Sequence, residues 1–148
     1  MTQEDKQLLL QDLCARLPYG VKFVFANSNI YTIKGINLGV TNEGYWEYFV
    51  DAKGIEPIEI EYVKPYLRPM SSMTEEEKKN YHKQVDIDLE RTAKSIKERF
   101  ESDTYNPENQ FTVQYCHIDW LNAHHFDYRG LIEKGLALEA PEGMYKEE

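Results

Sequence analysis

Four short runs between residues 21 and 63 decide the fold: VKFVF (21–25), NIYTIKGINLG (29–39), YWEYFVD (45–51) and IEIEYV (58–63). The runs are rich in β-branched and aromatic residues, and turn-forming residues separate them. In the last run, isoleucines and Tyr62 alternate with Glu59 and Glu61. This period of two is typical of a strand that is buried on one face. Residues 21–63 therefore predict an antiparallel sheet of four strands in a meander.

Gly35 lies inside the second run, where a side chain would be expected to pack. An isolated glycine within a strand predicts a bulge or a sharp bend. A bend at this position would let a small sheet curl. We therefore expect residues 21–63 to form a strongly bent sheet, or a partial small barrel of the SH3-like kind.

The first 18 residues predict an α-helix in front of the sheet. Thr2 can serve as the N-cap, and Glu4 and Asp5 fall in the first turn, where the helix dipole favours acids. Leucines then recur at helical spacing until Pro18. Cys14 falls among these leucines, so we expect it to be a buried thiol in the core.

The sheet is followed by a segment with two prolines, residues 64–73, which predicts a linker or a strap. A long amphipathic helix is then predicted over residues 74–101, with a capping box formed by Thr74 and Glu77. Its apolar stripe is narrow. Such a stripe can dock on the sheet, which we favour, or pair with a second copy as a homodimer through helix 74–101.

The carboxy-terminal part, residues 111–138, predicts a fifth strand followed by a helical plug over the open end of the sheet. Asp127 is placed to cap a short helix over residues 128–134, and Gly135 can end that helix in the left-handed conformation. Residues 139–148 are expected to be a tail. The predicted class is therefore α+β, with residues 1–148 forming a single domain.

Composition restricts the possible partners. The chain has 148 residues, 41% of them hydrophobic, and a formal net charge of -9, which disfavours nucleic acid and anionic membranes and favours basic partners. Two cysteines without metal-ligand spacing, Cys14 and Cys116, indicate reduced thiols rather than a disulfide framework. The acidic start and the lack of a long apolar run indicate a cytoplasmic protein. No cofactor is predicted.

Negative charge is concentrated in the predicted sheet. Residues 43–61 contain six acids against one base, a net of five negative charges, and the whole chain has 11 tyrosines. Tyrosine offers a large contact area with a polar tip and is enriched at interfaces. The residues expected to bind a protein partner are Glu43, Glu47, Asp51, Glu59 and Glu61.

One group of residues has the chemistry of a metal site. If the segment around 118–126 is helical, His124 and Asp127 follow His117 by seven and ten residues. These spacings are close to whole helical turns, so the three side chains could point in one direction. Two histidines and a carboxylate can hold iron or zinc. However, buried residues share that face, and no HExxH motif supports the site. Cys116 and His117 could also suggest a nucleophile and its base, but neighbours on a strand point to opposite faces and would not easily share a proton. We therefore predict a capping role for Asp127 and no enzyme.

Three stretches of the chain carry a family resemblance: LLLQDLCARLPYGVKF (8–23), VKPYLRPMSSMTEEEKK (63–79) and DWLNAHHFDYRGLIEKGLALEAPEGMY (119–145). Together they cover about 60 of the 148 residues. They resemble a family of small proteins from gut-dwelling anaerobic bacteria, their phages and other mobile elements. This family has no established activity, so the resemblance implies a biological context but no functional residues. It also implies that the charged helix at 74–101 lies in a variable insertion.

Three functions are compatible with these patterns. The favoured hypothesis is a non-catalytic interaction or regulatory module that binds a protein partner through an acidic, tyrosine-rich surface. The alternative is a metal-dependent enzyme that uses His117, His124 and Asp127. The third is a small barrel that binds or mimics nucleic acid, which the net charge and the scattered lysines disfavour for direct binding.

Overall fold

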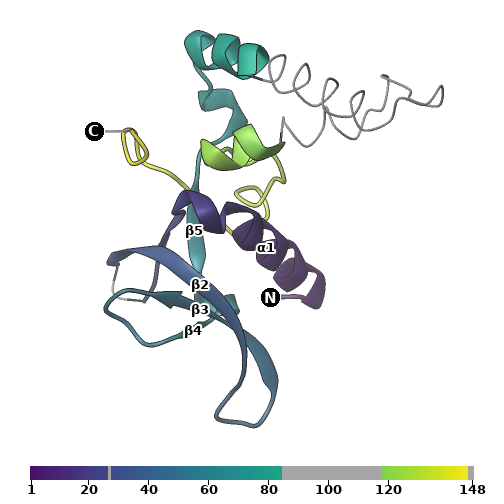
Figure 1. Ribbon diagram of the computed structural model, residues 1–148. Coiled ribbons are helices and arrows are strands. Elements are labelled where there is room, and N and C mark those ends of the chain that lie inside the picture. The colour runs from purple at the N-terminus through teal and green to yellow at the C-terminus, as the bar shows by residue number, and fades with distance from the viewer. Residues whose placement is uncertain (27, 85–117, 147–148) are drawn as a thin grey trace, which may run out of the picture. The chain divides into compact units, whose positions relative to one another are not determined.

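The computed structural model describes residues 1–26, 28–84 and 118–146. Two compact units are present, and the second is inserted into the sequence of the first. The first consists of Met1–Met70 and Asn122–Glu148, and the second of Ser71–Leu121. Figure 1 shows the helix and the sheet that make up most of the first unit.

The predicted amino-terminal helix is confirmed as α1, Gln3–Arg16. Thr2 caps it, since its hydroxyl accepts a hydrogen bond from the Asp5 amide at 3.1 Å and the Asp5 carboxylate accepts one from the Thr2 amide. The short 3₁₀ helix η1, Leu17–Tyr19, continues it and ends at Gly20, whose φ is 67°. Leu9 and Leu13 of α1 are buried, but Cys14 is exposed. The prediction of a buried Cys14 thiol is therefore wrong, because Cys14 lies outside the apolar stripe of the helix.

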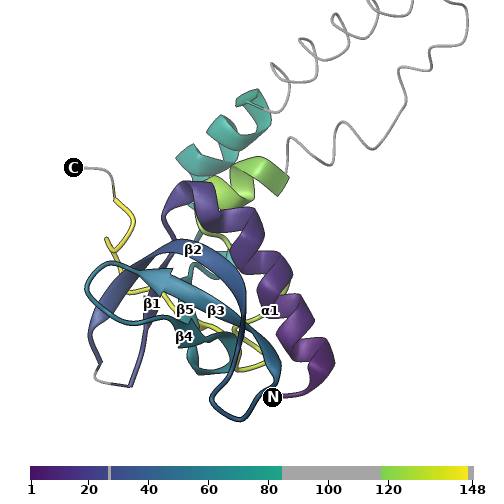
Figure 2. The same ribbon diagram turned by 60° about the horizontal axis from the view of Figure 1, so that its bottom comes forward.

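Six strands form one sheet within the described residues: β1 (Lys22–Val24), β2 (Ile30–Val40), β3 (Trp46–Ala52), β4 (Ile58–Glu59), β5 (Lys64–Leu67) and β6 (Leu138–Glu139). Their order is β4-β3-β2-β1-β5-β6. Every neighbouring pair is antiparallel except β5 and β6, which run parallel. The meander of β1 to β4 confirms the prediction from the sequence, and Figure 2 shows it beside α1.

Strand β2 bends where the sequence predicts it. Its first residues pair with β1, and its register with β3 shifts between Ile33 and Gly35. The bulge predicted at Gly35 is therefore confirmed. Because of the bend, one long strand pairs with β1 at its start and with β3 along the rest of its length.

The fourth predicted strand, residues 58–63, is largely wrong. Only Ile58–Glu59 forms a strand, and the 3₁₀ helix η2, Ile60–Tyr62, follows immediately. The Val63 amide closes this turn by donating to the carbonyl of Ile60 at 3.1 Å. The turn rotates Tyr62 away from its predicted buried face, so Tyr62 is 59% exposed.

The segment 64–73 was predicted to be a linker or a strap, and this is wrong for its first four residues, which form β5. Pro65 lies opposite Phe23 of β1, and Val63, Pro65 and Leu67 are buried. These three residues alternate with polar or half-buried ones, as in any strand with one buried face. The prolines at 65 and 69 obscured this alternation in the sequence. A short 3₁₀ helix, η3, follows at Met70–Ser72.

The second unit is described in part. Residues 75–84 are helical. The predicted capping box is confirmed, because the Thr74 amide donates to the Glu77 carboxylate at 2.9 Å and the Glu77 amide donates to the Thr74 hydroxyl at 3.1 Å. Tyr81 contacts the ring of Trp120 edge-on, with ring centres 5.0 Å apart. The rest of the predicted helix 74–101 and the predicted strand at 111–115 lie outside the described residues.

The predicted short helix at 128–134 is wrong, although its capping residues act as expected. Asp127 accepts hydrogen bonds from the amides of Leu131 and Ile132, both at 2.9 Å. Residues 128–135 form successive turns instead of a helix. Gly130 and Gly135 both have positive φ, 74° and 71°, and the first interrupts any regular helix. The left-handed Gly135 confirms that part of the prediction.

The core lies between α1, the sheet and the carboxy-terminal segment of the first unit. Its buried members are Leu9, Leu13, Val21, Phe23, Ile33, Val50, Ile58, Ile60, Val63, Leu67, Leu131, Leu136 and Ala137. A buried ion pair adjoins it, in which Arg16 donates to both carboxylate oxygens of Asp12 at 2.8 and 3.0 Å. Arg16 also donates to the carbonyl of Phe126 at 2.7 Å. This pair therefore ties α1 to the returning chain.

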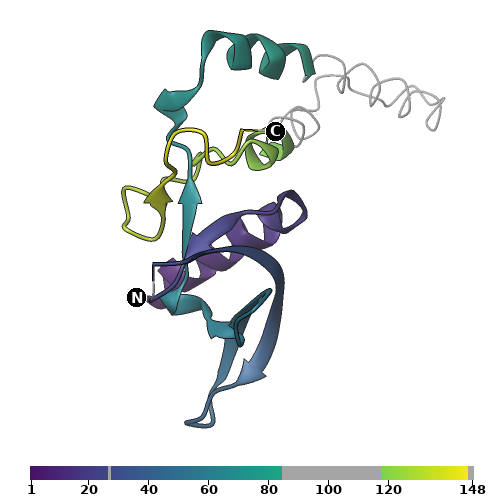
Figure 3. The same ribbon diagram turned by 90° about the vertical axis from the view of Figure 1, so that its left-hand side faces the viewer.

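The last described residues pack against the sheet. The Tyr145 hydroxyl donates to the carbonyl of Tyr66 at 2.8 Å and accepts from the amide of Lys22 at 3.0 Å. Its ring stacks on His125, with ring centres 3.7 Å apart. Residues 139–148 were predicted to be a tail, and Tyr145 fixes part of this segment to β1 and β5. Figure 3 shows the carboxy-terminal segment near β5.

Candidate functional site

The hairpin of β2 and β3 carries an apolar surface that α1 and the core do not cover. Leu38 pairs with Tyr48, and Val40 pairs with Trp46. Opposed residues share a face of an antiparallel pair, as do residues two apart on one strand. These four side chains, called the hairpin face below, are 56%, 39%, 54% and 71% exposed in that order. Figure 3 shows the hairpin extending away from α1.

The hairpin face continues the core-facing side of the strands. The next pair inwards, Ile36 and Val50, belongs to the core region, and Val50 is fully buried. The apolar alternation therefore runs on past the point where the core ends. Large exposed apolar patches on soluble proteins mark interaction sites more often than isolated exposed residues do. The hairpin face is such a patch.

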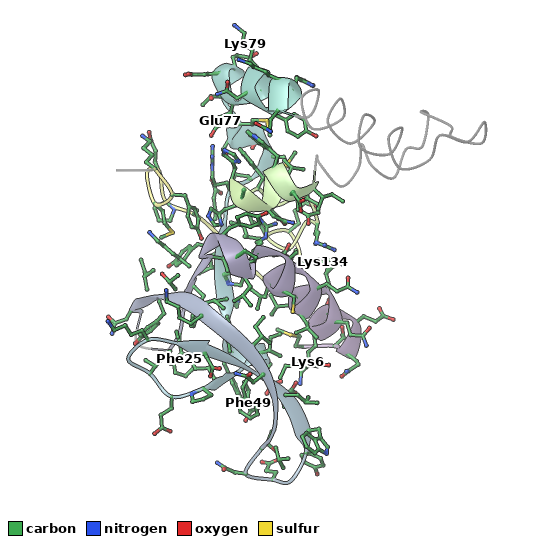
Figure 4. The ribbon with its side chains drawn as sticks, viewed as in Figure 1. Lys6, Phe25, Phe49, Glu77, Lys79 and Lys134 are labelled. Carbon is green, nitrogen blue, oxygen red and sulfur yellow. The ribbon has the colours of Figure 1, made fainter. Side chains whose placement is uncertain are left out.

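Acidic residues surround the hairpin, but two of them already have a partner. Lys6 of α1 forms an ion pair with Glu47 and lies 3.5 Å from a carboxylate oxygen of Glu61. The hydrogen bond to Glu47 raises the pKa of Lys6. Glu47 and Glu61 were both predicted to bind a partner, and both help fix α1 to the sheet. Figure 4 labels Lys6 near the amino-terminal end of α1.

The other three predicted partner-binding acids differ in their surroundings. Glu43 is exposed in the turn between β2 and β3. Asp51 accepts a hydrogen bond from the side chain of Asn37. Glu59 lies in β4 opposite Phe49. The structure therefore places Glu43 at the hairpin and Glu59 at a groove on the sheet.

This groove has a volume of about 450 Å³. Its lining comprises Phe25, Val40, Thr41, Asn42, Phe49, Ile55, Glu56, Pro57, Ile58, Glu59 and Tyr62. It is called the groove below. Val40 contributes both to the lining of the groove and to the hairpin face. Figure 4 labels Phe25 and Phe49, which provide two of its three rings.

One edge of the Phe49 ring lies against the backbone at Gly39. A Cβ atom at position 39 would lie 3.0 Å from two carbons of that ring, closer than side chains normally approach. Glycine at this position therefore leaves room for the edge of the ring beside β2. Phe25 packs against the core cluster with part of its side chain. Two of the groove's three rings are thus held by the fold.

The groove has a negative electrostatic environment. The hydrogen bond to Glu61 and the charges of Glu61 and Glu59 raise the pKa of Tyr62 at its rim. Among the described residues, Glu56 and Glu59 have no basic side chain within ion-pair distance. These two carboxylates are therefore available to a positively charged ligand.

The candidate metal ligands have different positions. His117 lies outside the described residues, and His124 is partly exposed. Both oxygens of Asp127 accept backbone hydrogen bonds, so its carboxylate acts as a cap for the turns that follow. Within residues 1–26, 28–84 and 118–146, no group of three or more histidine, cysteine or acidic side chains could hold a metal ion.

Several residues of this site were missed in the sequence. Trp46, Leu38 and Val40 follow the alternation of a buried strand face, and the sequence alone does not mark where the core ends. Glu56 and Phe49 were assigned to no site because the groove depends on the loop before β4 and on η2. One signal was available: Gly39 is the second glycine in β2, and glycine within a strand can mark a close packing contact.

No protein-family model, curated protein sequence or solved structure matches this chain. In the part of the chain that the structure describes, no helix is both long and apolar enough to span a membrane.

Proposed function

We propose that this protein is a non-catalytic interaction module that binds a protein partner through the hairpin face and the acids beside it. The observation that carries the proposal is the exposure of Trp46, 71%, in register with three other exposed apolar side chains. Tryptophan and tyrosine contribute strongly to binding when an interface buries them. The regulatory role, and the phage or mobile-element context that the resemblance implies, remain part of this proposal.

The same proposal includes an SH3-like small barrel as the scaffold. Three features support it: the meander of β1 to β4, the return of β5 to pair with β1, and the 3₁₀ helix between β4 and β5. The bend in β2 lets this strand take part in both halves of the sheet. In such a scaffold the hairpin and the loops provide the binding surface, while the core maintains their geometry.

Charge determines which partner suits this surface. The chain has a formal net charge of -9, with a net of five negative charges in residues 43–61. Two copies of the chain would therefore repel each other around the hairpin. A partner with an apolar centre and lysines or arginines at its edge would bury the hairpin face and approach Glu43 favourably. We expect such a partner, rather than a second copy or a nucleic acid.

A quantitative affinity capture compares three forms of the protein in a lysate of its natural host. The wild type is expected to retain a partner that Trp46→Ser loses by tenfold or more, because truncating a central aromatic residue typically costs more than about 1.4 kcal/mol. Ile30→Ser is the matched control, since Ile30 is 53% exposed but lies at the other end of β2. It should bind as the wild type does.

The captured partner must then be purified and its binding segment mapped by cross-linking. An apolar segment with flanking lysines or arginines, whose binding weakens with added salt, would support the proposal. The proposal fails if all three forms retain the same proteins, or if Ile30→Ser and Trp46→Ser lose binding equally.

A further inference from the structure

We propose that the groove beside the hairpin is a binding site for a guanidinium group. This inference concerns the groove lined by Phe25, Phe49, Tyr62, Glu56 and Glu59, and it stands apart from the role proposed for the hairpin face. The site combines aromatic rings with carboxylates in one hollow of about 450 Å³. The chemistry of these groups selects the class of ligand.

The rings supply the first part of the site. One edge of Phe49 lies against the backbone at Gly39, and Phe25 packs partly against the core, so the fold restricts the positions of both rings before a ligand binds. Tyr62 is 59% exposed at the rim. An aromatic face attracts a cation that lies within about 6 Å of its centre. Preorganised rings reduce the entropy lost on binding.

The carboxylates supply the second part. Glu59 is in β4, opposite Phe49 in the register, and Glu56 lies in the loop just before that strand. Glu47 and Glu61 lie close to Lys6, whereas the described residues provide no such ion-pair partner for Glu56 or Glu59. These two acids therefore add hydrogen-bond acceptors and negative charge beside the rings.

A guanidinium group suits this combination better than an ammonium group. It is planar and weakly hydrated, so it can stack on a ring while its N–H groups donate to a carboxylate in its own plane. The lysine ammonium is compact and strongly hydrated, and it would lose more solvation against the rings. A quaternary ammonium could contact the rings but has no N–H group for the glutamates. The groove thus favours arginine over lysine.

Backbone NMR of the full-length protein, titrated with Nα-acetyl-arginine amide and with Nα-acetyl-lysine amide, tests this selectivity. The arginine probe is expected to shift the amide resonances of residues that line the groove, with an affinity at least five times that for the lysine probe. Glu59→Gln is expected to weaken arginine binding about tenfold, because it removes a charged acceptor. Tyr62→Ser, a change at an exposed position, should weaken it several-fold.

Glu133→Gln is the matched control for charge. Glu133 is exposed and lies outside the groove, and its replacement changes the net charge as much as Glu59→Gln does. The proposal is refuted if Glu133→Gln weakens binding as much as Glu59→Gln, if lysine binds as well as arginine, or if the shifts lie away from the groove. The dispersion of each variant's spectrum shows directly whether the variant is folded.

Ethylguanidinium and the peptide Gly-Arg-Gly distinguish the two sources of the group. A peptide that binds more tightly than ethylguanidinium assigns the groove to an arginine side chain of a protein. Equal binding assigns it to a small guanidinium compound. Trp46→Ser is expected to bind the arginine probe as the wild type does, because Trp46 does not line the groove. The arginine titration and the affinity capture therefore test the groove and the hairpin face separately.

Discussion

The buried imidazole of His125 predicts a specific pH dependence of stability. His125 is 6% exposed and stacks on Tyr145. Burial, together with the positive charges of Arg16, Lys22 and Arg68 and a contribution from the neighbouring His124, lowers the pKa of His125 from 6.5 to about 3. Between these two pH values the unfolded chain binds a proton at this position and the folded chain does not. The free energy of unfolding must therefore fall as the pH falls through this range.

The magnitude follows from the two pKa values. Within the range, each pH unit changes the stability by up to about 1.4 kcal/mol. Between pH 7 and pH 5, His125 lowers the free energy of unfolding by about 2 kcal/mol. The first half unit of this interval contributes little, because it lies above the pKa of 6.5 in the unfolded chain. This interval also lies above the range in which most carboxylates titrate.

Urea unfolding at half-unit steps from pH 7 to pH 5 measures this effect in the wild type and in His125→Asn. Asparagine is suitable because position 125 has a φ of 61°, which asparagine adopts more readily than most residues. The variant loses the stacking contact equally at every pH. It should also lose the part of the pH dependence of stability that comes from His125. The other three histidines are present in both proteins. Parallel stability profiles for the two proteins would refute the reasoning.

Three further predictions concern the fold. Asp12→Asn should lower the free energy of unfolding by roughly 3–5 kcal/mol in urea melts, because it leaves the buried Arg16 guanidinium without its counter-charge; an effect below about 1 kcal/mol would contradict this. Gly39→Ala should cost about 1–3 kcal/mol through its clash with the Phe49 ring. A double-mutant cycle with Phe49→Leu should remove most of that cost, and additivity would be the contrary result. Tyr145→Phe should cost about 1–3 kcal/mol in thermal melts, because a β1 amide and a β5 carbonyl lose their partner; an unchanged melting temperature would argue against this contact.

The sequence predicted those elements whose structure depends on local chemistry. Thr2 and Thr74 are followed three residues later by an acid, and both caps form. Gly35 interrupts a strand pattern, and the register shifts there. Each of these predictions needed only the identity of a few neighbouring residues.

The errors occurred where a distant contact or a local turn overrides the periodic pattern. Pro65 suggested a linker, yet it is compatible with a strand because β1 provides a neighbour in the right register. The position of Tyr62 in the alternating pattern predicts a buried side chain, but η2 turns this side chain outwards. The exposed state of Trp46 could not be predicted either, because it depends on how far the core extends beneath the hairpin. The groove combines residues 25, 40–42, 49, 55–59 and 62, which are separated in the sequence, and it had no signature there.

The point at which the second unit leaves and rejoins the first has an evolutionary consequence. Arg68 donates its amide to the carbonyl of His125 and accepts from the amide of Asp127, both at 2.8 Å. The departing and returning chains are therefore fastened to each other before the inserted segment begins. Each doubling in the length of a flexible loop costs only about 0.6 kcal/mol in closure entropy. During evolution, the segment inserted at this junction can therefore change in length or be replaced without a change in the sheet.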